Sequence, residues 1–393
     1  MRKQNELFKK IVLIILTCIS AYNLLFPIFT HSQIFTQRFV PLVYEKKYNN
    51  SQYVIPQSKT PISDEELLSY AGFKYATGLN PILINSDHPP FGKYLIGWFT
   101  LLTGNNRVVS LFFGGGVIIL LCSIIFFLTQ SYLLTALGLF MLSVDSIFLD
   151  QLLYSPVLDI IHVFFLLLFF LFFLFWLKNK CNVLIISMGL TLGAFASTKL
   201  YFPALILLAY TTVFLLLIRK SIKLVITFFC TNLVIGFIFY MMTYTSFFLH
   251  GNSLRGFFGA QKWIFLFWKN NSINTGAYFG NMLPLILFNR WRVWWGTQKY
   301  IPFVHWTLFW PAFFSIGFIA SVWFVYQYAT SMRLKKNKLK QADQPELFLS
   351  LWIIIATIYL MFIPISPRYL MIIFFPMYIT IALFAKRLFP KYV

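Results

Sequence analysis

The sequence is short of charge, and above all of acidic residues. Charged side chains make up 11% of the 393 residues, and 32 lysines and arginines are accompanied by only 11 aspartates and glutamates. With 59% hydrophobic residues and a mean hydropathy of +0.75, the chain has too few polar side chains to cover a soluble globule of this length. This shortage excludes a soluble protein and indicates a lipid environment.

Cysteine and histidine are also scarce, and neither is arranged as a disulfide framework or a metal site. The four cysteines fall in or beside apolar runs, without a CxxC pair or a Cys/His cluster. Packing or interface roles are expected for four of the five histidines: His31, His162, His250 and His305. No metal site and no firm cofactor are predicted, and the carboxylates described below leave a divalent cation as an open alternative.

Long apolar runs recur along the whole chain. Each run of roughly 18 to 23 residues can cross a hydrocarbon core of about 30 Å as a helix, and the runs lack the alternation of barrel strands. The predicted fold is an all-α integral membrane protein with about ten transmembrane helices. The predicted spans are 11–30, 107–128, 131–149, 158–177, 182–198, 200–218, 224–247, 302–327, 347–365 and 368–387.

The basic residues are distributed as membrane topology requires. An even number of spans puts both termini on one side, and the short segments on that side hold 17 of the 32 lysines and arginines, as the positive-inside rule predicts for the cytoplasm. The first run lacks a cleavage pattern and is expected to be retained as a helix. Because the basic residues form no soluble domain, the net charge of +21 indicates a multi-pass protein of the cell membrane and no nucleic-acid partner.

The opposite side carries two long loops that divide the chain. We expect a catalytic transmembrane module over 1–247 that includes the outer loop 31–106. A Trp-rich loop, 248–301, is expected to lie partly along the membrane interface as a helix, since Trp favours the headgroup layer. Further transmembrane helices follow over 302–393.

Acidic residues gather on this outer side or just below it, which is the first indication of function, because residues that only solvate loops need not share one face. Eight of the 11 acidic residues do so: Glu45, Asp64, Glu65, Glu66, Asp87, Asp145, Asp150 and Asp159.

The most informative stretch lies in the first outer loop. The segment Ser63–Gly78 begins as a short amphipathic helix, with Ser63 or Asp64 as its cap. The pair Pro89–Pro90 then holds Asp87–His88 in an extended turn before the chain becomes helical again. These two acidic segments can face one another above the membrane, and a capped surface helix followed by a plain proline turn is the alternative.

These motifs resemble a known family. An Asp-Glu pair that opens a helix in the first outer loop, followed by HPPxGKxLIG over His88–Gly97, resembles the protein O-mannosyltransferase type of GT-C glycosyltransferase, including bacterial relatives that use polyprenyl-phosphate sugars. Three supporting matches follow in order: Leu158–Asp159, Ser197–Lys199 and Pro367–Leu370. The resemblance covers the N-terminal two-thirds of the chain and, through the last motif, its end.

The resemblance implies a GT-C-like helical bundle and a role for each matched residue. Asp64 would be the base that takes the acceptor proton, and Glu65 would orient Asp64 or contact the sugar. Asp87 and His88 would support the same pocket. Asp159 is expected to contact substrate or to cap its helix. The cations expected to bind the donor phosphate near the outer interface are Lys93, Lys199, Arg255 and Arg368.

The implied reaction transfers a hexose, such as mannose, from a polyprenyl-phosphate donor to a hydroxyl of a protein, glycan or lipid acceptor at the outer face, with inversion. The family commonly has an arginine where this chain has Tyr154, so a donor-phosphate or structural contact is supplied differently here. Alternatives are a transporter or flippase for lipid-linked glycans, a membrane scaffold, and a polymerase or ligase that uses a diphosphate donor.

Overall fold

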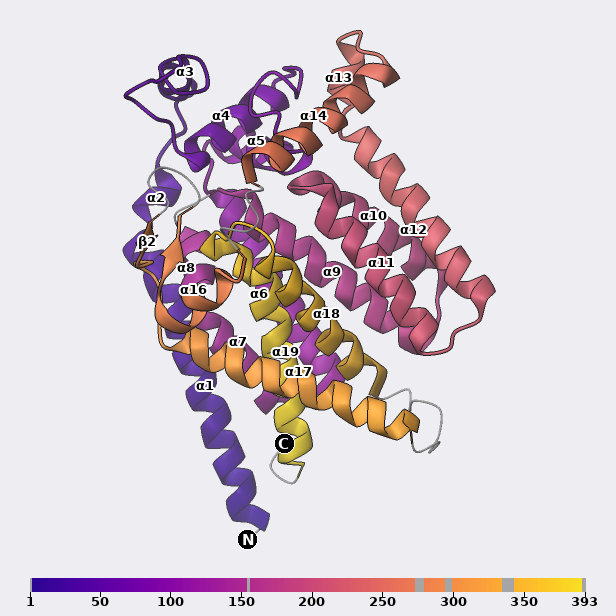
Figure 1. Cartoon of the computed structure of the whole chain (residues 1–393). Coiled ribbons are helices and arrows are strands. Elements are labelled where there is room, and N and C mark those ends of the chain that lie inside the picture. Colours follow the sequence, from indigo (N-terminus) through magenta and orange to yellow (C-terminus); the bar gives the residue numbers. More distant parts are fainter. Residues whose placement is uncertain (1, 154–155, 273–278, 294–298, 334–342, 391–393) are drawn as a thin grey trace.

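The structure is a computed structural model, and it describes the whole chain apart from residues 1, 154–155, 273–278, 294–298, 334–342 and 391–393. Nearly all of the described residues lie in helices or the turns between them (Figure 1). The described part also contains a two-stranded antiparallel hairpin, β1 (Trp291–Arg292) and β2 (Tyr300–Ile301), with Trp291 opposite Ile301.

Among the described residues, seven helical segments are long and apolar enough to cross a membrane. They are α1 (Arg2–Thr30), α6 (Val108–Thr129), α9 (Leu158–Asn179), α12 (Ile222–Met242), α17 (Phe309–Arg333), α18 (Gln344–Met361) and the pair η2 (Pro367–Leu370) and α19 (Met371–Leu388). An eighth span is formed if α7 (Tyr132–Ser143) and α8 (Ser146–Leu153), which are bent by 68°, are taken together. Two shorter apolar helices, α10 (Asn182–Thr198) and α11 (Tyr201–Leu217), complete the set.

Each of the ten predicted runs therefore corresponds to a helix or to the bent pair, and the expected all-α, multi-pass membrane fold is confirmed. Several boundaries differ by a few residues, and two differences have a visible cause. The span predicted over 302–327 begins only at Phe309, because residues 300–301 pair as β2 and Pro302 cannot continue a ladder. The span predicted over 131–149 is broken near Asp145.

Asp145 explains this break. Its side chain accepts a hydrogen bond from the Ile147 backbone N–H at 3.0 Å, as a helix cap does, and a second from the Tyr378 hydroxyl at 2.9 Å. The residue is 1% exposed. The two hydrogen bonds offset the free-energy cost of burying its carboxylate. The carboxylate thus ends α7, starts α8 and ties the bend to α19.

The helices form one bundle with α9 near its centre. Buried residues of α6, α9, α10, α18 and α19 belong to a single hydrophobic cluster, in which Phe169, Phe170 and Phe173 are fully buried. Both termini lie at one end of the bundle (Figure 1).

The opposite end carries the short helices that will concern the site: α3 (Pro41–Asn49), α4 (Asp64–Ala76), α5 (Phe91–Thr103), α13 (Thr245–Leu249) and α14 (Leu254–Ser272) (Figure 1). The remaining short helices are α2 (Gln33–Thr36) and α16 (Met282–Phe288).

Helices α4 and α5 meet through two glycines. A Cβ on Gly97 would lie 1.9 Å from the Gly72 carbonyl oxygen, and a Cβ on Gly72 would lie 2.5 Å from the Lys93 carbonyl oxygen. Only glycine permits so close an approach of the two backbones. Because α4 begins with Asp64 and α5 carries Lys93, this contact fixes the two charged segments of the first long loop relative to each other.

Candidate functional site

The start of α4 is built as the sequence predicts. Ser63 is the cap, since its hydroxyl accepts from the Glu66 backbone N–H at 3.4 Å while Glu66 Oε2 accepts from the Ser63 N–H at 3.5 Å. Glu66 also contacts Lys47 at 2.5 Å. With the capping duties taken by its neighbours, Asp64 projects from the first turn of α4 with 57% of its side chain exposed.

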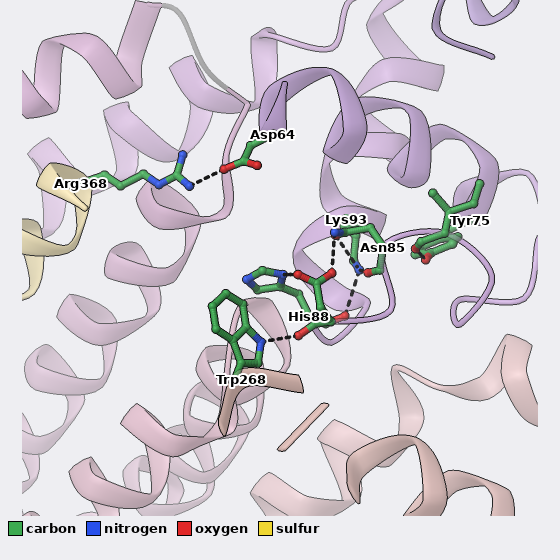
Figure 2. Close-up of polar contacts among 9 residues, drawn as sticks. Asp64, Tyr75, Asn85, His88, Lys93, Trp268 and Arg368 are labelled. Carbon is green, nitrogen blue, oxygen red and sulfur yellow. Dashed lines mark hydrogen bonds and ion pairs between the residues drawn. The ribbon is translucent and has the colours of Figure 1, made fainter. Parts of the chain in front are cut away.

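Arg368 joins Asp64 to the membrane helices. It projects from η2, just before α19, and its Nη2 donates to Asp64 Oδ2 at 2.6 Å (Figure 2). Its Nε lies 3.2 Å from Asp159 Oδ2. One guanidinium therefore bridges two carboxylates from α4 and α9, as its planar fork of donors allows.

Asp159 pairs with a second cation. It opens α9 and is 7% exposed, and its Oδ1 contacts the ammonium of Lys199, which follows α10. The Lys199 ammonium also lies 3.8 Å from the centre of the Tyr369 ring. Asp64, Arg368, Asp159 and Lys199 thus form one chain of alternating charges, which we call the charge relay. Its four members come from four segments far apart in the sequence.

A second polar cluster forms around the proline turn. Lys93, on α5, is fully buried and its ammonium donates to the carbonyl oxygens of Asn85 and His88, the latter at 2.9 Å (Figure 2). Asn85 in turn donates from its side-chain amide to Asp87 at 2.5 Å. The sequence predicts that Lys93 binds the donor phosphate. In the structure its ammonium instead donates to backbone carbonyl oxygens of the proline turn and so stabilises that turn.

Burial changes the pKa of both charged groups in this cluster. It lowers the pKa of Lys93 to about 7, although the Asp87 carboxylate opposes the shift. Burial acts to raise the pKa of Asp87, but the attraction and hydrogen bond of His88, together with Lys93, outweigh it and hold that pKa below its usual value. Asp87 is therefore the anionic member of the cluster at neutral pH.

Trp268, in α14, holds the other side of the turn. Its indole N–H donates to the Asp87 carbonyl oxygen at 2.7 Å, and its ring meets the His88 ring edge-on at 5.1 Å (Figure 2). Nδ1 of His88 lies 3.0 Å from Asp87 Oδ2. The Trp-rich segment contains a helix, α14, as predicted, and the Trp268 contact shows that α14 packs on the first long loop. Trp294 and Trp295 lie outside the described residues.

A cavity of about 420 Å³ opens beside the charge relay. Asp159, Lys199 and Tyr369 line it at the relay end, and Trp268 and Lys269 line it from α14. Its other walls are apolar: Phe202, Pro203 and Ile206 of α11, and Leu360, Phe362, Ile363, Pro364 and Ile372 around α18 and α19. We call it the main cavity because it adjoins the charge relay; a larger cavity, of about 1210 Å³, opens elsewhere and is lined by Lys178, Glu346 and Arg387 among others. Charged groups at one end and hydrocarbon elsewhere suit an amphiphile with an anionic head.

The predicted residues do not all meet at this cavity. Asp64, Glu65 and Arg368 are absent from the described residues that line it. Arg368 adjoins the cavity through its contact with Asp159, and Asp64 is linked to it through Arg368. His88 instead lines a separate cavity of about 230 Å³ with Tyr244 and Trp263. Glu65 is half-buried in the first turn of α4. Tyr154 lies outside the described residues.

Arg255 lies away from the relay. It is exposed at the start of α14, whereas Lys269, which lines the main cavity, is in the last turn of the same helix. At about 1.5 Å per residue, roughly 20 Å of helix separates the two. Lys269, Tyr369 and Trp268 are cavity residues that sequence reasoning missed, and only the position of Tyr369 within the Pro367–Leu370 motif pointed to it.

No group of three or more His, Cys, Asp or Glu side chains suited to a metal ion occurs in the part of the chain that the structure describes. Where carboxylates gather, cations separate them, as Arg368 does for Asp64 and Asp159. A divalent ion would have to displace that arginine to reach both carboxylates.

Comparison with known proteins identifies the fold through structure alone. No family model and no curated protein sequence matches the chain. A crystal structure of ArnT from Cupriavidus metallidurans bound to undecaprenyl phosphate is similar, with a TM-score of 0.53 and 12% sequence identity. The similarity covers 83% of this chain and 56% of ArnT, so this chain matches little more than half of that protein's length. The protein has an ArnT-like fold.

Proposed function

We propose that the protein is a membrane glycosyltransferase that takes a sugar from a polyprenyl-phosphate donor. The observation that carries the proposal is the charge relay at one end of an apolar cavity, in a fold shared with a protein whose crystal structure contains undecaprenyl phosphate. The donor's isoprenoid tail would lie along the apolar walls and its phosphate at the relay end. The sugar is a hexose such as mannose, and the acceptor is a hydroxyl of a protein, glycan or lipid.

Lys199 and Arg368 are the proposed phosphate ligands. The relay holds two cations and two carboxylates, so a bound phosphate makes this group of charges negative unless further positive charge is near. Lys269 is exposed and lines the same cavity, so it is the proposed source of that charge. A partly desolvated site strengthens each of these attractions relative to water. Arg255 and Lys93 are not needed for this role.

Asp64 is the proposed base. The acceptor oxygen attacks the anomeric carbon and its proton passes to Asp64, while the bond from that carbon to the phosphate oxygen breaks and its electron pair leaves with polyprenyl phosphate. Direct displacement inverts the anomeric centre. A phosphate leaves without acid help, so one base and several cations are sufficient. When Arg368 turns toward the phosphate, its ion pair with Asp64 weakens. The carboxylate then accepts a proton more readily, because a nearby positive charge no longer favours its ionised form.

His88 and Asp87 are proposed to act on the acceptor side. His88 lines the smaller cavity and pairs with Asp87, and Trp268, which lines the main cavity, contacts both residues. Glu65 would contribute by orienting Asp64. The active site would lie at the end of the bundle opposite the termini, which corresponds to the outer face if the termini are cytoplasmic.

The test is a transfer assay with purified protein, a polyprenyl-phosphate mannose donor and a mixture of peptide and glycan acceptors. We expect Asp64→Asn to lower the rate by about 10²- to 10⁴-fold, the usual contribution of a general base. Glu66→Gln, two residues along the same helix turn, is the matched control and should stay within a few-fold of wild type. Equal rates for wild type and Asp64→Asn would remove Asp64 from the base role.

A further inference from the structure

We infer that His162 is a ligand for the group bound in the main cavity, where its Nδ1 contacts an oxygen of a lipid phosphomonoester. The inference rests on the proposed function and deepens it by adding a residue that the sequence assigns only to packing.

His162 lies in the cavity wall beside the relay. It follows Asp159 by three residues on α9, so both side chains lie on one face of the helix about one turn apart. It is 4% exposed and lines the main cavity together with Asp159 and Lys199. Its ring stacks on Phe195, with 3.8 Å between ring centres and an interplanar angle of 27°. The imidazole is therefore held in a fixed orientation.

The imidazole has an unused hydrogen-bonding atom. Its Nδ1 is buried and has no hydrogen-bond partner among the described residues. A buried polar atom without a partner destabilises the fold, and such atoms are uncommon. An occupant of the cavity that supplies the missing partner removes this cost, so the ligand-free protein is strained in a way that favours binding.

The chemistry of the cavity limits what that partner can be. The walls near His162 are hydrocarbon or aromatic, including Phe202, Ile206 and Ile372, and an isoprenoid or acyl tail along them offers no hydrogen-bonding atom. The head group of the amphiphile is the part that can reach Nδ1. Lys199 lies in the same wall and attracts an anion, so a phosphate oxygen meets both: the ammonium supplies charge, and Nδ1, when it carries the ring proton, donates a hydrogen bond.

The experiment measures binding by detergent-solubilised full-length protein to three probes: farnesyl phosphate, farnesol and inorganic phosphate. His162→Phe keeps a ring against Phe195 and removes both nitrogens, whereas His162→Asn keeps an amide attached at the carbon that bears Nδ1. Lys199→Met tests the proposed function separately. The melting temperature of each ligand-free variant is measured in parallel.

We expect His162→Phe to weaken farnesyl phosphate binding about tenfold to hundredfold, the usual effect of losing a hydrogen bond to a charged group. His162→Asn should recover part of the loss, and farnesol binding should be unchanged. The ligand-free melting temperature of His162→Phe should equal or exceed that of wild type, because the unpartnered atom is gone. A residue needed only for packing would lower this temperature and would affect both isoprenoid probes alike.

Three results would overturn the inference. If His162→Phe binds farnesyl phosphate like wild type while Lys199→Met does not, His162 is not a ligand and the proposed function stands. If wild type binds farnesyl phosphate no more tightly than farnesol, the inference and the proposed donor class both fail. If inorganic phosphate binds as tightly as farnesyl phosphate, the ligand is free phosphate and not a lipid phosphomonoester.

Discussion

Arg368 and Asp64 are 304 positions apart in the sequence, and yet the arginine donates to the carboxylate at 2.6 Å. The contact joins the last membrane segment to the first long loop. Arg368 also reaches Asp159 at 3.2 Å, so the position of a surface carboxylate is linked to a buried one at the cavity wall. This double contact makes Arg368 the residue through which donor binding and base function would be coupled.

Replacement of Arg368 by lysine tests whether sugar transfer needs the several N–H donors of the planar guanidinium or only its positive charge. A single ammonium cannot keep both carboxylate contacts in the same geometry. We expect kcat/KM for sugar transfer to fall about tenfold to hundredfold. The control is Arg387→Lys, because Arg387 also bridges two carboxylates, Glu346 and Asp343, but lies in the last turn of α19, away from η2. Equal losses in the two variants would argue against a specific role for Arg368.

The Lys93 cluster predicts a pH dependence of stability. The pKa of Lys93 is lowered to about 7 in the folded protein, so between pH 7 and the usual lysine value near 10.4 the unfolded chain binds more protons than the folded one. Lys93 thus makes stability rise with pH over this window, by at most about 1.4 kcal/mol per pH unit.

Replacement of Lys93 by methionine should abolish this contribution. We also expect a melting temperature several degrees lower at pH 9, because the carbonyl groups of Asn85 and His88 lose their donor. Melting temperatures of wild type and variant from pH 6 to 10 test both statements. Parallel curves for the two proteins would exclude Lys93 as the titrating group.

Trp268 should hold the proline turn through its indole N–H. In Trp268→Phe the aromatic contact with His88 is largely kept, but the 2.7 Å hydrogen bond to the Asp87 carbonyl is lost. We expect faster amide hydrogen exchange in residues 85–88, by about fivefold or more, since the turn opens more often. Trp263→Phe is the control, as Trp263 lies on the same helix and is 45% exposed. Unchanged exchange in the Trp268 variant would show that the turn needs no support from α14.

The α4–α5 contact should tolerate no side chain. Gly97→Ala places a methyl group 1.9 Å from the Gly72 carbonyl oxygen, so the helices must separate. We expect the variant to melt at least several degrees lower and to lose transfer activity, because α4 carries Asp64. Gly115→Ala on α6 is the control, since a Cβ there has nothing within 4 Å and alanine favours the helix. Similar melting temperatures for the two variants would contradict the close approach.

The sequence predicted the helices well for a simple reason. An apolar run of membrane length has few alternatives to a helix in lipid, and this holds for α6 and α9 without reference to their neighbours. A local signal also placed the start of α4: a cap was predicted at Ser63 or Asp64, and the structure has it at Ser63, since capping depends on residues only three positions apart. The break at Asp145 escaped the prediction, because its stabilising partner, Tyr378, is 233 positions away.

What the sequence by itself determined was the class of the protein and the set of polar residues from which a site could be made, since both follow from composition and short-range spacing. What only the tertiary structure decided was the direction and partner of each side chain. It directed the Lys93 ammonium at the backbone of its own loop and set Arg368 between Asp64 and Asp159. It also left Nδ1 of His162 without a hydrogen-bond partner in a cavity wall. The reason is that partners are set by which faces of the helices pack together, and a sequence of nearly uniform apolar helices does not encode that choice locally.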